Sequence, residues 1–84
     1  MATTPAERAG QNVRAEMARK AITQAQLGTE LGMSQTAVSA RLRGLIPFDV
    51  NDLTTTAEFL DVTVADLLPT EVTETRERVK ASVS

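Results

Sequence analysis

Five side chains between residues 35 and 43 are short, neutral or basic, and would share one face of a helix. Helical geometry turns them outward if Val38 and Leu42 face a core. Their amide and hydroxyl groups can hydrogen-bond to base edges, Arg can bind phosphate, and no carboxylate among them would repel a polyanion. This face therefore favours binding in the major groove of double-stranded DNA. Its members are Gln35, Thr36, Ser39, Ala40 and Arg43.

Apolar residues and glycines around this face predict two short helices joined by a tight turn. Gly32 can adopt the positive φ that closes a helix, and Gly28 leaves room for a crossing helix. The pattern predicts a helix-turn-helix, although any helical hairpin in a small all-α domain could share it. The apolar pairs, each four residues apart, are Leu27 with Leu31 and Val38 with Leu42.

Cap residues predict where five helices begin, and so an all-α fold. The first helix should span residues 5–20, the second should run from Thr23 to Gly32, and the third should span 35–43. The fourth should span 50–60, and Pro69 should stop a short fifth helix. Val50, Leu53, Ala57 and Leu60 are expected in the core, with Phe59 as one of its walls. The predicted N-caps are Thr4, Thr23, Ser34, Asp49 and Thr63.

The composition allows one small domain and argues against an enzyme. The chain has 84 residues and contains neither Cys nor His, which removes disulfides, thiolate and imidazole metal ligands and a His general base. Two carboxylate pairs, Asp49 with Asp52 and Asp61 with Asp66, lie in predicted caps or turns and need no catalytic explanation. We expect no cofactor and no metal.

The charge is unevenly distributed along the chain. The net charge is −2, which at first argues against a nucleic-acid ligand. Residues 1–46 nevertheless carry six basic and three acidic side chains, whereas residues 47–84 carry three basic and eight acidic ones. Such a molecule would present its amino-terminal half to DNA and hold its acidic half away.

The segment from Thr23 to Gly44 resembles the helix-turn-helix of the Cro and lambdoid-repressor group, the XRE family. The most specific part is the run Thr-Gln-x-x-Leu-Gly-x-x-Leu-Gly-Met-Ser-Gln, and the likeness extends from about Pro5 to about Leu68. The resemblance implies a five-helix lambda-repressor-like DNA-binding domain, whose helices 2 and 3 form the helix-turn-helix.

The resemblance also implies roles for individual residues. Gln24 would contact a phosphate and would also brace Gln35. Thr36 and Ala40 would touch bases, while Thr23 and Arg43 would touch the DNA backbone. Together with the outward face, this predicts two sets of contacts. The base contacts are Gln35, Thr36, Ser39 and Ala40, and the backbone contacts are Thr23, Gln24, Ser34, Arg41 and Arg43.

Three residues depart from the family pattern. Relatives often carry Lys or Arg just after the Gly that ends the recognition helix, whereas this chain has Leu45 and Ile46. We expect these two to pack under the fourth helix. Arg41 stands where the family is usually apolar, and its stem could cover the core while its head reaches outward toward phosphate.

The carboxyl-terminal part offers a candidate dimer surface and a polar tail. In the lambdoid group the fifth helix often builds a two-fold dimer, which would place Val64, Leu67 or Leu68 at a subunit interface. Leu67 and Leu68 could equally close the monomer's own core, and the two roles are not exclusive. We expect residues 1–69 to form the domain and residues 70–84 to be a tail that is flexible or marginally helical.

These observations predict a sequence-specific transcriptional regulator, such as a small phage-type or prokaryotic repressor that binds a palindromic operator as a homodimer. The amino terminus lacks the features of a signal peptide and no apolar run could span a membrane, so a cytoplasmic location is expected, with no membrane partner and no small-molecule ligand. The alternative is a helical protein-interaction module or an antitoxin-like regulator that acts mainly through a protein partner.

Overall fold

The computed structural model describes residues 3–69, which form five helices and no strand. The all-α prediction is therefore confirmed for this part of the chain, whereas the predicted tail, residues 70–84, lies outside it. None of the helices in residues 3–69 is long and apolar enough to cross a membrane. The helices are α1 (Pro5–Lys20), α2 (Gln24–Leu31), α3 (Gln35–Leu42), α4 (Val50–Leu60) and α5 (Val64–Leu67).

Every helix begins at the cap that the sequence predicts. Thr23 shows the reciprocal arrangement: its Oγ1 accepts a hydrogen bond from the Gln26 backbone N–H at 3.1 Å, while Gln26 Oε1 accepts one from the Thr23 N–H at 2.8 Å. Two N–H groups that the helix cannot satisfy internally are thereby paired. The same reciprocal arrangement, a capping box, occurs at the start of α1 and of α5, whereas a single side-chain acceptor caps α3 and another caps α4.

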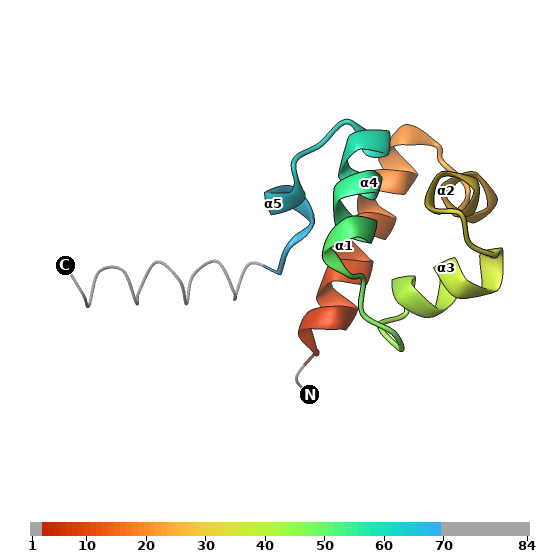
Figure 1. Cartoon of the computed structure of the whole chain (residues 1–84). Helices are drawn as coiled ribbons and strands as arrows, with labels where there is room; N and C mark the ends of the chain where they lie inside the picture. The colour runs from red at the N-terminus through yellow and green to blue at the C-terminus, as the bar shows by residue number, and fades with distance from the viewer. Residues whose placement is uncertain (1–2, 70–84) are drawn as a thin grey trace.

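Helices α1 and α4 lie side by side at the centre, α2 and α3 lie on one side of them, and α5 lies on the other (Figure 1). Each helix contributes apolar side chains to a single core, so the helix-turn-helix is part of that core and has no separate one. The buried members are Val13, Met17, Leu27, Val38, Leu42, Phe48, Leu53, Ala57, Leu60 and Leu67.

Two glycines allow the backbone to approach closely near α3. A Cβ on Gly10 would collide with the Leu42 carbonyl, so α1 presses directly against the end of α3. A Cβ on Gly28 would lie 2.7 Å from the Met33 carbonyl oxygen. The room at Gly28 is therefore needed mainly by the turn between the helices, and only secondarily by the crossing helix.

The predicted core of α4 is correct except at its first residue. Leu53, Ala57 and Leu60 are buried, and Phe59 packs against the core. Val50 is instead 78% exposed, because the first residue of this helix lies outside the side that meets the rest of the fold. Thr56, which the sequence did not single out, is fully buried.

A hydrogen bond between distant segments holds α5 in place. Asn12 Nδ2 of α1 donates to the carbonyl oxygens of Leu67 and Leu68, each at 3.2 Å, and so satisfies the end of this short helix. Leu67 has no exposed surface, so it closes the monomer's core and its predicted dimer contact is wrong. Val64 and Leu68 are only partly buried, and a dimer contact there remains a prediction.

Candidate nucleic-acid interface

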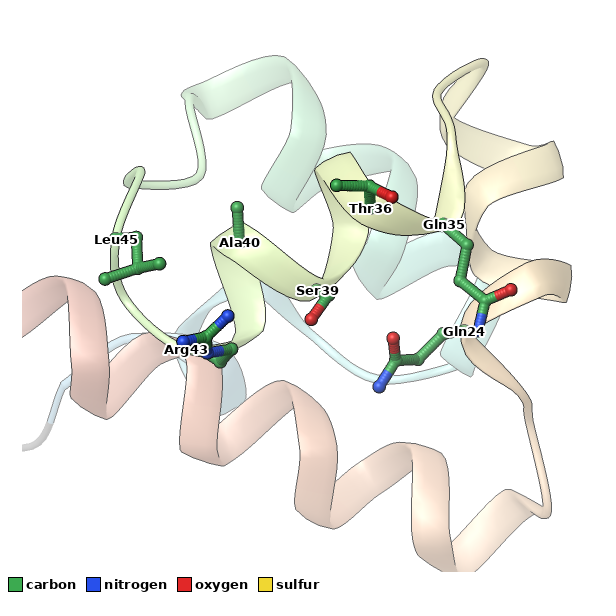
Figure 2. Close-up of a pocket in the computed structure, with 7 residues that line it drawn as sticks. All are labelled: Gln24, Gln35, Thr36, Ser39, Ala40, Arg43 and Leu45. Atoms are coloured by element: carbon green, nitrogen blue, oxygen red, sulfur yellow. The ribbon is translucent and has the colours of Figure 1, made fainter.

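Helix α3 has an inner face that belongs to the core and an outer face that is open. Val38 and Leu42 are 0% and 3% exposed, as predicted. The opposite side lines a shallow depression of about 450 Å³ (Figure 2), which we call the α3 depression. Its lining residues are Gln24, Gln35, Thr36, Ser39, Ala40, Arg43 and Leu45.

The structure brings all four predicted base-contacting residues into the α3 depression. Gln35 and Thr36 are exposed in the first turn of α3, while Ser39 and Ala40 are half-buried one turn later. Because they project from a helix anchored by the core, their backbone positions relative to one another are fixed. The geometry therefore provides a firm, polar helix face of the width that a major groove admits.

Gln24 reaches the α3 depression from a different helix. It is the first residue of α2, and Gln35 is the first residue of α3; both side chains line the depression (Figure 2). The turn from Gly32 to Ser34 places these two helix starts at one edge of the molecule. The bracing of Gln35 by Gln24 that the resemblance implies remains a prediction.

The α3 depression carries no acidic side chain, and Arg43 is its single cation. From Thr23 to Leu45 the chain has one carboxylate, Glu30, which lies on α2 outside the depression. By contrast, residues 47–69 contain five acidic and no basic side chains. The electrostatic character of this face therefore suits an anionic partner, although the net charge of the chain is negative.

Two of the predicted backbone contacts flank the α3 depression. Thr23 and Ser34 are exposed N-caps whose hydroxyl oxygens accept hydrogen bonds from Gln26 and Ala37, each at 3.1 Å. A hydroxyl that accepts one hydrogen bond still has its proton to donate. Each can therefore cap its helix and donate to a phosphate oxygen at the same time.

Arg41 is placed differently from the expectation. Its stem is largely buried, but its Nε lies 3.4 Å from Asp52 Oδ2, and its Nη1 donates to the Ala37 carbonyl oxygen at 3.0 Å. The head is therefore directed toward α4 and not outward, so it would have to leave Asp52 before it could bind phosphate. In this structure Arg41 links α3 to α4.

Leu45 and Ile46 are exposed, at 65% and 45%, so the prediction that they pack under α4 is wrong. The connector turns back after Gly44 instead of running beneath the fourth helix, and only Phe48 from it enters the core. Leu45 thereby joins the α3 depression.

Arg14 is a further cation near this face, and it is not among the predicted DNA contacts. It lines a second depression of about 370 Å³ together with Thr23 and Gln24. Because Gln24 lines both depressions, Arg14 lies beside the α3 depression. Its position in the sequence does not predict this location, because Arg14 comes to lie beside the α3 depression only through the packing of α1 against α3.

Within residues 3–69, two carboxylates have a lowered pKa, and both serve helix caps outside the α3 depression. The backbone N–H and then the hydroxyl of Thr4 hold the pKa of Glu7 below its usual value, and Thr63 does the same to Asp66. Among residues 3–69, no group of His, Cys, Asp or Glu is arranged to hold a metal ion.

The helix-turn-helix family matches residues 13–67, and several solved structures share the fold. The clp gene regulator ClgR from C. glutamicum superimposes with a TM-score of 0.74 at 24% identity, covering 79% of this chain and 86% of that one. The DNA-binding domain of BldD gives a TM-score of 0.69 at 24% identity, covering 82% of this chain and 100% of that one. The restriction-modification controller protein C.AhdI from Aeromonas hydrophila gives a TM-score of 0.68 at 22% identity, covering 74% of this chain and 94% of that one.

Among curated proteins, none matches this chain significantly in sequence. The family match nevertheless covers well over half of the 84 residues and includes both helices that line the α3 depression. The chain therefore belongs to the XRE-type helix-turn-helix family of DNA-binding transcriptional regulators.

Proposed function

We propose that this protein is a sequence-specific regulator that reads double-stranded DNA by inserting α3 into the major groove. The observation that carries the proposal is the α3 depression, which presents amide, hydroxyl and guanidinium groups but no carboxylate on the second helix of the matched helix-turn-helix. Amides and hydroxyls at these positions match the donors and acceptors on base edges. A generic solvated helix face would carry Glu and Lys instead.

In this proposal the residues divide into base readers and backbone anchors. Gln35 offers its amide to an adenine, and Thr36, Ser39 and Ala40 make smaller contacts to neighbouring bases. The backbone anchors hold α3 in register by binding phosphates on either side of the groove. They are Thr23, Gln24, Ser34 and Arg43, with Arg14 as an addition and Arg41 only after it leaves Asp52.

We further propose that the protein acts as a two-fold dimer on a palindromic operator and represses by occluding it, in the manner of small phage-type or other prokaryotic repressors. The two copies of α3 would then lie about 34 Å apart, one turn of DNA. Val64 and Leu68 support this proposal, because they leave part of the α5 edge uncovered in the monomer. Two of the proteins with similar structures are named as a gene regulator and a restriction-modification controller protein.

Selection of bound sites from random duplex DNA tests the proposal. A palindromic site is expected, and replacing Gln35 with Ala should cost about 1–3 kcal/mol on it and relax the preference at one base position. Gln35→Ala protein that binds with unchanged discrimination would contradict base reading by Gln35. Recovery of no enriched sequence would contradict sequence-specific binding altogether.

A second candidate function is a helical module, or an antitoxin-like regulator, that acts mainly through a protein partner. The exposed apolar side chains Leu45, Ile46 and Val50 favour it, since proteins use such surfaces to bind one another. Binding to sheared DNA separates the two functions: affinity that falls steeply with salt supports the DNA regulator, and no binding at low salt supports the protein module.

A further inference from the structure

The α3 depression contains one large apolar side chain among its polar ones. Leu45 is 65% exposed and lines the same surface as Ser39, Ala40 and Arg43 (Figure 2). An isolated exposed Leu needs no explanation, but here it occupies the surface that the proposed function places against DNA.

The backbone holds Leu45 firmly against the end of α3. Its N–H donates to the Ala40 carbonyl oxygen at 2.9 Å, and the Gly44 N–H donates to that of Arg41 at 3.1 Å. With Gly44 at φ +78°, this is the Schellman arrangement that ends many helices. A Cβ on Gly44 would lie 2.7 Å from Glu7 Cα, so the turn is also pressed against α1. Leu45 is therefore positioned as an extension of the recognition helix.

Packing within the monomer does not account for the exposed surface of Leu45. A Schellman turn often brings the side chain after the Gly onto the helix, which here would be onto Ala40. That contact still leaves 65% of Leu45 exposed. The rest of its surface is free to meet a ligand that enters the depression.

The major groove presents one apolar group, the C5-methyl of thymine. We propose that Leu45, beside Ala40, contacts a thymine methyl and so determines specificity for an A·T pair at the edge of each half-site. This inference rests on the proposed function. Where relatives often carry Lys or Arg just after the Gly, this chain would contact a base.

The test replaces thymines one at a time by uracil in the duplex recovered by selection, which removes only the methyl group. Wild-type protein should lose roughly fourfold in affinity at one thymine per half-site, the effect of exposing one methyl group. Leu45→Ala protein should bind the thymine and uracil duplexes equally at that position. Ile46→Ala is the matched control, because Ile46 is an exposed neighbour outside the depression and should keep the wild-type ratio.

Each other result has a distinct meaning. If replacing thymine by uracil lowered the affinity of Leu45→Ala and wild-type protein equally at every position, the proposed Leu45 contact would be wrong. Loss of self-association in Leu45→Ala with an unchanged thymine preference would overturn it in favour of a protein interface. Wild-type protein that binds no duplex at low salt would instead overturn the proposed function. Thermal unfolding of both variants should match wild type, since the turn is held by backbone hydrogen bonds.

Discussion

The helices of the proposed DNA-reading unit and the two helices that follow it are capped by different chemistry. In α2 and α3 the capping side chains are neutral: Thr23 with Gln26, and Ser34. In α4 and α5 carboxylates take part: Asp49 caps α4 and Asp66 completes the box of α5. All of them satisfy the same unpaired N–H groups.

The difference shows where the chain omits negative charge. The helix dipole favours an acid in the first turn of any helix, and Asp is as good an N-cap as Ser. Neutral caps at α2 and α3 therefore forgo a small stabilisation. In the proposed function these two helix starts face phosphates, where a carboxylate would weaken binding, whereas the starts of α4 and α5 do not.

The largest expected effect on DNA affinity comes from replacing the neutral N-cap of α3 with an acidic one like that of α4. Ser34→Asp should leave the melting temperature near that of wild type, because Asp preserves the cap. Affinity for the selected duplex should fall about tenfold or more at low salt, because a carboxylate then faces the phosphates. Fluorescence anisotropy and thermal unfolding measure the two quantities.

The reverse exchange, Asp49→Ser, is the matched control. It should preserve both the stability and the affinity, since Asp49 caps α4 outside the α3 depression. If the two exchanges weakened DNA binding equally, the distinction between the two regions would be lost.

A smaller effect is expected from removing one cap in each region. Thr23→Ala and Thr63→Ala should each lower the free energy of unfolding by about 1 kcal/mol, which corresponds to a decrease of roughly 4–8 °C in Tm for a domain of this size. Only Thr23→Ala should also weaken DNA binding, because it removes a hydroxyl that can donate to phosphate. Equal affinities of the two variants would remove Thr23 from the interface.

The smallest effect is a dependence of stability on pH that arises in the acidic caps. The pKa of Glu7 is held below its ordinary value of 4.5 by the Thr4 backbone and hydroxyl. Its stabilising contribution is therefore complete above that value and is lost as the pH falls through the lowered folded pKa. Glu7→Gln, which can still accept the hydrogen bond, should show a flatter fall in Tm below about pH 4.5 than wild type.

Glu58→Gln serves as the control for this substitution, because only the backbone of Glu58, and not its side chain, takes part in a helix cap. It should retain the wild-type acid dependence. An identical acid profile for Glu7→Gln and wild type would show that the Thr4 box does not contribute.

Local signals in the sequence predicted the helices well. The bounds of α1 and α4 agree with the expectation, because a cap and the residue three positions later act within one turn and need no tertiary information. The outer face of α3 was predictable for the same reason, since Val38 and Leu42 fix which side is buried.

Contacts between distant segments were beyond reach of the sequence. Asn12 meets the end of α5 from 55 residues away, and Arg41 of α3 pairs with Asp52 of α4 across the connector between these helices. The connector showed the same limit: hydrophobicity suggested burial of Leu45, whereas the turn at Gly44 sends it to the surface. Leu67 failed as a dimer contact because the monomer's core already encloses it.

Mapping the surface that meets DNA tests the central claim most directly. The backbone and side-chain amide resonances of the protein would be followed by NMR during titration with the selected duplex at low salt. The proposal predicts the largest shifts from Thr23 to Leu45, including the side-chain amides of Gln24 and Gln35, and small shifts in α4, whereas shifts at Val64 and Leu68 would report the proposed dimer contact. Shifts concentrated in α4 and α5, or none anywhere, would contradict the claim that α3 reads DNA.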